Sequence, residues 1–298
     1  MTISSNELKG HLAMLAFSGL VAGSFALGVR VANDISPAAF TLIRFVIAVS
    51  ILATFILTKT GFTKNVLKAP WRFFVLGGCI AIYFVLMFEG LKIASSVSLA
   101  AVFTFAPLFS GFFGYILMRQ KMSLSILIAL IIGAVGALWV VFEGNLNRLI
   151  MLQFGLGELI FFCGVIFHSL YTPLSRKLNR GESPLIFAFA TTLGATILMI
   201  FYGLGDVFKT DLLSLSWMVW ATLIYTALFA SAVTFFLIQF ATLLLPSSKV
   251  MAYTYLVPSW ALLWELGLGQ GVSIYNIGFG ITLTILALVI LLWAPEGV

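Results

Sequence analysis

The feature that most constrains the fold is a succession of long apolar segments, each separated from the next by a short polar cluster. A helix needs about 20 apolar residues to cross a hydrocarbon core about 30 Å thick, and each segment is close to that length. The segments are continuously apolar rather than alternating, which excludes a membrane β-barrel. Ten membrane-spanning helices are therefore expected, at about residues 11–29, 36–58, 71–93, 95–118, 123–142, 154–176, 184–204, 217–243, 246–268 and 272–293.

The composition excludes a water-soluble domain. Only 9% of the residues are charged and 62% are hydrophobic, whereas a soluble domain is about a quarter charged. The segments between the expected helices are too short to form a further domain, so any function must be carried out within or across the membrane. We expect an all-α, multi-pass integral protein of the plasma or inner membrane, with the lipid bilayer as a partner. The net charge of +6 requires no nucleic acid, because a basic cytoplasmic face beside anionic headgroups accounts for it.

Sequence motifs for cofactors and metals are missing. No G-x-x-x-x-G-K-[ST] phosphate loop occurs, so ATP is not hydrolysed through that motif and energy would come from a gradient. Cys79 and Cys163 each lie within an expected helix and are interpreted as packing residues. We therefore expect no cofactor and no metal site.

The distribution of Lys and Arg predicts that both termini are cytoplasmic, because positive charges gather at the cytoplasmic ends of membrane helices. With that orientation the inside set is Lys9, Lys59, Lys64, Lys68, Arg72, Arg119, Lys121, Arg176, Lys177, Arg180 and Lys249. The outside set is smaller and is mixed with acidic residues: Arg30, Lys92, Arg148 and Lys209 beside Asp34, Glu143, Asp206 and Asp211.

The chain contains a sparse internal similarity. At a spacing of 147 residues "SPAAF" (36–40) falls on "SPLIF" (183–187), and at a spacing of 151 residues Pro107 falls on Pro258. Each half holds five expected helices, an odd number, so the halves would insert with opposite orientation. We predict two inverted five-helix repeats, which occupy residues 1–146 and 147–298.

Two segments resemble a known family. "FEGLKIASSVSLAAVFTFAPLFSGFFGYILMRQKMS" (88–123) and "LIQFATLLLPSSKVMAYTYLVPSWALLWELGLGQGVS" (237–273) are similar to the two copies of the EamA module of the drug/metabolite transporter superfamily. In that family a helix ends in a short Ser/Ala-rich corner and the next helix carries a central proline. The resemblance covers nearly the whole chain. It implies a membrane carrier of small organic metabolites, often an exporter, with a cavity between the two halves.

The matched prolines, Pro107 and Pro258, are the first candidates for a substrate site. Each lies well inside an expected helix, where proline removes a backbone hydrogen bond and bends or breaks the helix. Two matching interruptions indicate a site near the middle of the membrane, although a static packing kink is the alternative. Thr104 lies on the same helix face as Pro107, and Tyr255 lies on the same helix face as Pro258, so both are added to the cavity candidates.

Arg44 is an arginine within an otherwise uncharged segment, about 12 Å from Ser36 at 1.5 Å per residue. Because arginine keeps its proton in a protein, the side chain either reaches back to the interface or faces a polar interior with an anionic partner. Four partners are considered: Glu89, Glu158, Glu265 and a carboxylate of the substrate.

Three further polar groups are candidates for proton coupling. Glu89 and Glu265 lie near expected helix ends, where a boundary carboxylate is the alternative, and His168 lies midway along its helix, where a packing histidine is the alternative. Tyr171 follows His168 closely, and Tyr83 is one of the aromatic residues within the expected helices. Both are added to the cavity candidates.

The sequence therefore predicts a secondary transporter, an exporter of small organic metabolites such as amino acids, which works by alternating access and uses proton coupling. A membrane-embedded enzyme and a channel are the alternatives, but the chain lacks paired intramembrane aspartates, an H-E-x-x-H motif and a filter-like loop. The expected partner is a small-molecule substrate, and a homodimer is left open.

Overall fold

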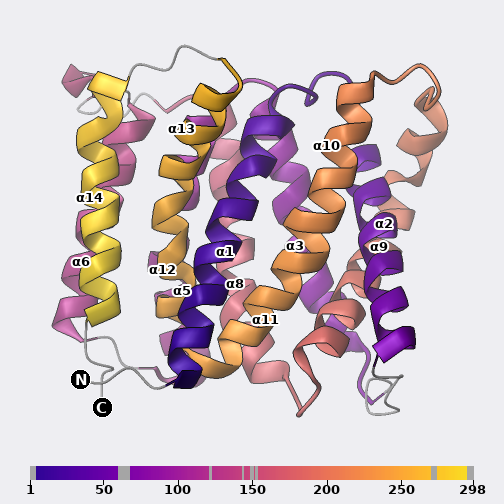
Figure 1. Ribbon diagram of the computed structural model, residues 1–298, viewed down its shortest axis with the longest axis horizontal. Coiled ribbons are helices and arrows are strands. Elements are labelled where there is room, and N and C mark those ends of the chain that lie inside the picture. The colour runs from indigo at the N-terminus through magenta and orange to yellow at the C-terminus, as the bar shows by residue number, and fades with distance from the viewer. Residues whose placement is uncertain are drawn as a thin grey trace.

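The computed structural model describes residues 5–59, 68–120, 123–142, 144–147, 151, 154–269 and 274–293, and within these ranges the chain is helical without a strand. Figure 1 shows the helices running between two ends of the bundle. Their bounds are α1 (Ser5–Gly28), α2 (Pro37–Lys59), α3 (Trp71–Leu91), α4 (Ser96–Phe103), α5 (Ala106–Met118), α6 (Leu124–Val141), α8 (Leu156–Leu178), α9 (Pro184–Lys209), α10 (Trp217–Ala227), η2 (Leu228–Val233), α11 (Thr234–Leu244), α12 (Ser247–Ala252), η3 (Tyr253–Leu256), α13 (Val257–Gly267) and α14 (Ile274–Trp293).

Eight helical segments in the described ranges are long and apolar enough to cross a bilayer. A shorter apolar helical stretch, Ile277–Trp293, lies within α14. The expected span at 246–268 is divided into α12, η3 and α13. Large apolar side chains such as those of Phe201, Phe208 and Trp293 are exposed on the surface, as expected where lipid is the solvent. The protein is thus an all-α, multi-pass membrane protein, and the count of ten spans stays a prediction.

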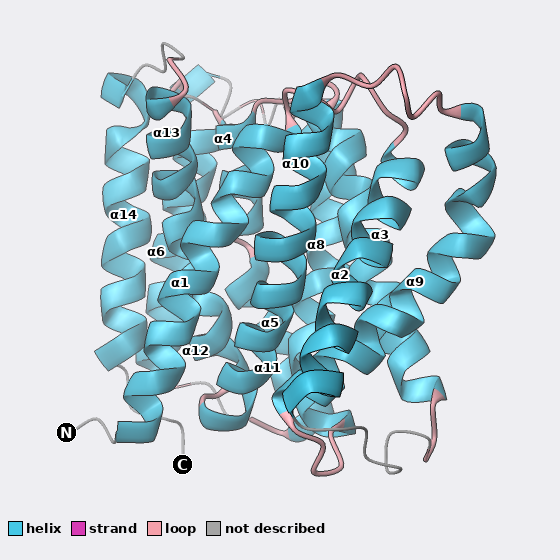
Figure 2. Ribbon diagram, turned by 45° about the vertical axis from the view of Figure 1, so that its right-hand side comes forward, coloured by secondary structure: helices cyan, strands magenta, loops and turns pink. Residues whose placement is uncertain are grey.

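Serine residues fix where several helices begin. The hydroxyl oxygens of Ser95, Ser123 and Ser183 accept hydrogen bonds from backbone N–H groups in the first turns of α4, α6 and α9. These bonds satisfy donors that a helix leaves unpaired at its start. The loops lie at the two ends of the bundle (Figure 2), and α1 begins at the same end at which α14 ends. Four loop residues used above for the orientation, Lys64, Lys121, Glu143 and Arg148, lie outside the described residues.

Helices of the two halves pack against one another in crossed pairs. α3 packs against α8 and α1 against α11, while α4 packs against α13 and α5 against α12. Two flanking pairs, α6 with α14 and α2 with α9, lie at opposite sides of the bundle in Figure 1. Small residues allow close approach: a Cβ on Gly194 in α9 would lie 2.4 Å from the carbonyl oxygen of Phe73 in α3.

Three of the expected membrane-crossing segments are interrupted. α4 ends at Phe103 and α5 starts at Ala106, one residue before Pro107, and the 3₁₀ turn η3 separates α12 from α13 just before Pro258. Both prolines occupy a first turn, where proline is tolerated because that position has no helical acceptor for its N–H. The breaks expected at the two prolines are therefore present. The third interruption was not expected: the π-helix η2 separates α10 from α11.

Candidate functional site

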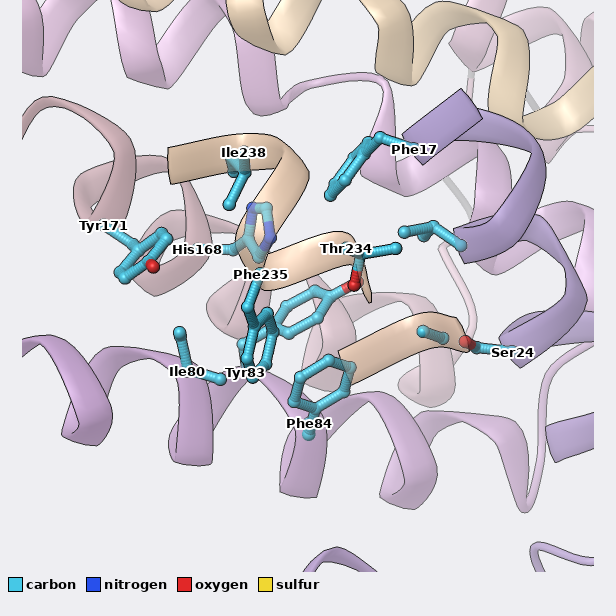
Figure 3. A pocket seen from close by; sticks show the side chains of 12 residues that line it. Phe17, Ser24, Ile80, Tyr83, Phe84, His168, Tyr171, Thr234, Phe235 and Ile238 are labelled. Carbon is cyan, nitrogen blue, oxygen red and sulfur yellow. The ribbon is translucent and has the colours of Figure 1, made fainter. Parts of the chain in front are cut away.

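A cavity lies between four segments of the bundle, and each half of the chain contributes two of them. Figure 3 shows side chains from α1, α3, α8 and the η2–α11 segment converging on this space. The lining residues are Phe17, Val21, Ser24, Ile80, Tyr83, Phe84, His168, Tyr171, Ala230, Thr234, Phe235 and Ile238. Phe17, Tyr83, His168 and Thr234 are each in the middle part of their membrane-crossing segment, so the cavity lies near mid-depth in the bundle.

The cavity is narrow. It has room for about a single water molecule. A metabolite can enter only if the walls separate. These walls belong to both halves of the chain.

Lining residues occupy corresponding positions in the two halves. Val21 and His168 are 147 residues apart, as are Ser24 and Tyr171, and all four line the cavity. At the spacing of 151 residues, Phe84 corresponds to Phe235, and both of these side chains line it as well. The same surface of each half therefore faces the cavity, but with different chemistry on the two sides.

His168 lies in an aromatic environment. Its ring centroid is 4.4 Å from that of Tyr83 and 5.0 Å from that of Phe103, and its Nδ1 atom is buried without a hydrogen-bond partner. Tyr171, one turn along α8, accepts a hydrogen bond from the side-chain amide of Gln239, which itself accepts one from Ser175 at 3.0 Å. Tyr171 is thus fixed by a buried network, whereas His168 retains a free ring nitrogen.

Arg44 is fully buried and does not reach the interface. Its Nε donates to the Ser231 hydroxyl and its Nη2 to the Ala230 carbonyl, each at 2.6 Å, while Nη1 has no partner. Both acceptors belong to η2. A π-helix leaves some carbonyl groups without their usual helical partner, so the extra residue of this segment makes an acceptor for the guanidinium. The guanidinium carbon also lies 3.7 Å from the ring centroid of Phe84, which lines the cavity.

The carboxylates that were considered as partners of Arg44 are bound elsewhere. Glu265 pairs with Arg30 at 3.1 Å and accepts a hydrogen bond from Ser96 at 2.5 Å. Glu158 accepts a hydrogen bond from Ser98 at 2.7 Å, and Glu89 pairs with Lys92 at 2.9 Å. Among the described residues no carboxylate contacts Arg44, which leaves the substrate carboxylate as the remaining candidate of the four.

Two ion pairs connect the halves, one at each end of the bundle. Arg30, just after α1, pairs with Glu265 near the end of α13. At the opposite end Arg72 of α3 pairs with Glu182, in the connection between α8 and α9, at 2.7 Å, and both side chains are almost fully buried. Burial opposes ionisation of Glu182, but hydrogen bonds from Arg72 and from backbone N–H groups outweigh it and lower its pKa below the ordinary 4.5.

The structure brings some of the sequence candidates together and places others apart. Tyr83, His168 and Tyr171 line the cavity, and Arg44 lies directly behind Phe84. The remaining candidates are buried outside the lining: Thr104, which donates to the Ala101 carbonyl, Pro107, Pro258, and Tyr255, which packs against Gly133. Of the coupling candidates, Glu265 joins two helices, whereas Glu89 pairs only with a residue three positions away.

Sequence reasoning missed most of the lining. Phe17, Ile80, Phe84, Phe235 and Ile238 are ordinary apolar residues of membrane helices, and neither type nor spacing separates those that face a cavity from those that face a neighbour or lipid. One signal was present. His168 lies 147 residues after Val21 and Tyr171 lies 147 residues after Ser24, so lining positions in the first half could have been predicted from His168 and Tyr171 by the repeat spacing.

A bundle of apolar helices around a mid-depth, largely apolar cavity between two halves is typical of a polytopic membrane transport protein. The sequence profile of the EamA-like transporter family matches residues 8–142 and 155–293, and this chain belongs to that family. It is 23% identical over 282 residues to "Uncharacterized transporter YyaM" of Bacillus subtilis (strain 168), covering 94% of this chain and 92% of that protein. A solved crystal structure has the same fold, with a TM-score of 0.73, 18% identity and coverage of 97% of this chain and 96% of the other.

Proposed function

We propose that this protein is a secondary transporter that exports small organic metabolites, of which amino acids are one class, by alternating access. The observation that carries the proposal is the cavity, which is lined by corresponding positions of the two halves and is too narrow for a solute in this form. Membership of a transporter family and similarity to a Bacillus subtilis protein that is named as a transporter support a transporter rather than an enzyme.

The crossed helix pairs support an arrangement as inverted repeats. If the halves are related by an axis in the membrane plane, then α3 with α8 corresponds to α11 with α1, and α4 with α13 corresponds to α12 with α5. Exchange of the conformations of the two halves would open the cavity at the opposite end. We place both termini in the cytoplasm and the protein in the plasma or inner membrane, on the distribution of Lys and Arg.

Glu265 is the carboxylate best placed for proton coupling. Its ion pair with Arg30 connects the halves at the outer end, so that protonation would neutralise the carboxylate and weaken the closure at that end. His168, in the cavity wall, is the second coupling candidate. Glu89 pairs with Lys92 on the surface, and its side chain is 40% exposed, so it provides a matched control.

Counterflow in proteoliposomes tests the proposal. Vesicles are loaded with one unlabelled metabolite at a time, and exchange with the labelled form is followed at increasing concentration. A carrier gives saturable exchange, whereas unsaturable flux indicates a channel. For coupling, an imposed pH gradient should drive transport in the wild type and in Glu89→Gln, but not in Glu265→Gln. Equal responses of all three proteins would remove Glu265 from the coupling mechanism.

A further inference from the structure

The charge on Arg44 is left without a counter-ion by the described part of the protein. The guanidinium is fully buried, its two hydrogen bonds go to a neutral hydroxyl and a neutral carbonyl, and Nη1 is unpaired. A buried charge is costly unless it is paired, and buried polar groups generally have a partner. The protein therefore keeps a cation and a free N–H donor close to mid-depth, where an anion from outside the chain would be strongly favoured.

The aromatic ring of Phe84 contacts this cation and is also part of the cavity wall. Phe84 lines the cavity and at the same time stacks on the guanidinium, at 3.7 Å from its carbon. Ala230, whose carbonyl accepts from Nη2, also lines the cavity. A change in the side-chain rotamer of Phe84 would therefore uncover the face of the guanidinium group to a molecule in the cavity, with the unpaired Nη1 at the edge of that group.

The unpartnered polar atoms in the cavity wall suit an anion. Ser24 has a hydroxyl without a partner and His168 has an unpaired Nδ1, and each of these groups can donate a hydrogen bond. No Asp or Glu is found among the lining residues that the structure describes. The remainder of the wall is apolar and aromatic, with Phe17, Ile80 and Phe235 among its side chains.

We propose that the cavity binds an organic monocarboxylate that has an apolar or aromatic body and lacks an ammonium group. Its carboxylate accepts hydrogen bonds from Arg44 Nη1 once Phe84 has moved aside, and its body packs against the aromatic wall. This assignment rests on the proposed transport function and narrows its substrate class. An α-amino acid fits less well, because the positive charge of Arg44 repels its ammonium group and the lining offers that group no carboxylate.

A series of four probes with one phenyl ring tests the assignment on the intact wild-type protein. The probes are 3-phenylpropionate, phenylalanine, 3-phenylpropylamine and 3-phenylpropanol, and binding is measured as the rise in the thermal midpoint of the purified full chain with probe concentration. We expect 3-phenylpropionate to bind about tenfold or more tightly than the other three, the ratio typical of one hydrogen bond to a charged group. Equal or tighter binding of phenylalanine or the alcohol, or no binding of any probe, would overturn the assignment.

Substitutions at Arg44 test which group selects the carboxylate. Arg44→Gln should lose the preference for 3-phenylpropionate over 3-phenylpropanol, and Arg44→Lys should recover part of it, because the charge remains. Arg176→Gln is the matched control, since Arg176 also donates to a carbonyl, but its acceptor Leu245 is not a lining residue, whereas Ala230, the acceptor of Arg44, is one. Retention of the preference in Arg44→Gln would show that another group selects the carboxylate. If Arg44→Gln does not fold, the wild-type series alone decides.

Exchange of the same probes across proteoliposomes separates this inference from the proposed function. Exchange of the alcohol or the amine in preference to 3-phenylpropionate would overturn the carboxylate assignment and leave transport intact. Binding of 3-phenylpropionate without any exchange would support the carboxylate site and contradict transport.

Discussion

Arg30 and Glu265 lie 235 residues apart in sequence and form an ion pair of 3.1 Å that ties α1 to α13. Ser96, at the start of α4, donates to the other carboxylate oxygen. Three membrane-crossing segments thus meet at one carboxylate, at the end of the bundle where α1 ends. Under the proposed mechanism this contact would have to loosen for the cavity to open at that end.

Neutralising Glu265 should increase access to the cavity. A cysteine at position 24, in a chain with Cys79 and Cys163 replaced, would be labelled by a membrane-impermeant maleimide from the side on which Arg30 lies. We expect Glu265→Gln to raise the labelling rate about fivefold, which corresponds to the loss of about 1 kcal/mol of closure free energy. Glu89→Gln should leave the rate unchanged. A rate that is the same in both variants would contradict a closing role for the pair.

Arg72 and Glu182 should stabilise the folded protein strongly, because both side chains are almost fully buried. Glu182→Ala leaves the Arg72 charge unpaired, at an expected cost of about 3 kcal/mol in the free energy of unfolding. The lowered pKa of Glu182 means that its contribution is complete above its unfolded pKa near 4.5 and is lost as the pH falls through the folded pKa. Thermal midpoints of the wild type and Glu182→Ala should therefore differ at pH 7 and converge as the pH is lowered below 4.5. A difference between the two thermal midpoints that grows towards low pH would contradict this role of the Glu182 carboxylate.

Gly194 should tolerate no side chain. A Cβ there would lie 2.4 Å from the Phe73 carbonyl oxygen, and a backbone atom of α3 cannot move aside as a flexible side chain can. We expect Gly194→Ala to destabilise the protein by about 1–3 kcal/mol through overpacking, measured as a lower thermal midpoint. Gly205, in the same helix, has nothing within 4 Å of a built Cβ, so Gly205→Ala should be neutral or stabilising by up to about 1 kcal/mol. Equal effects at both sites would contradict the close packing of α3 on α9.

Ser231 should stabilise the folded protein through its hydrogen bond with Arg44. Ser231→Ala removes the acceptor of Nε and leaves a charged donor without a partner, at an expected cost of about 1.5–3 kcal/mol in the free energy of unfolding. Ser50→Ala is the control, because that exposed hydroxyl bonds only to the Val46 carbonyl of its own helix. Denaturant or thermal unfolding of both variants measures the difference, and a similar small effect in each would show that the guanidinium finds another acceptor.

The helical membrane architecture could be predicted because it depends on the composition of long continuous segments. Runs of about 20 apolar residues have few other stable arrangements in a bilayer. The breaks near Pro107 and Pro258 could also be predicted, since proline has a definite effect on a helix. The π-helix at Leu228–Val233 could not be predicted from residue types, because its sequence, LFASAV, is compatible with an ordinary α-helix. Its Ser231 hydroxyl and Ala230 carbonyl bind the buried cation of Arg44, a residue far away in sequence.

The candidate site was predictable where it uses chemically distinctive residues. Arg44, His168, Tyr83 and Tyr171 stand out because a charged or polar group within a membrane is costly and therefore needs a reason. The direction in which these side chains point could not be predicted. Arg44 is held by Ser231 and Ala230, nearly 190 residues away, and such a contact exists only after the halves have assembled.

The widened turn at Leu228–Val233 also sets the angular position of everything that follows it in its segment. A π-helical turn takes up more residues than an α-helical turn, and an α-helix advances about 100° per residue. A return of this turn to regular α geometry with all of its residues kept would therefore rotate α11 by roughly a quarter of a revolution or more. Thr234, Phe235 and Ile238 would then turn away from the cavity, and the guanidinium of Arg44 would lose its carbonyl acceptor. The widened turn thus aligns one wall of the cavity and holds the buried charge behind it.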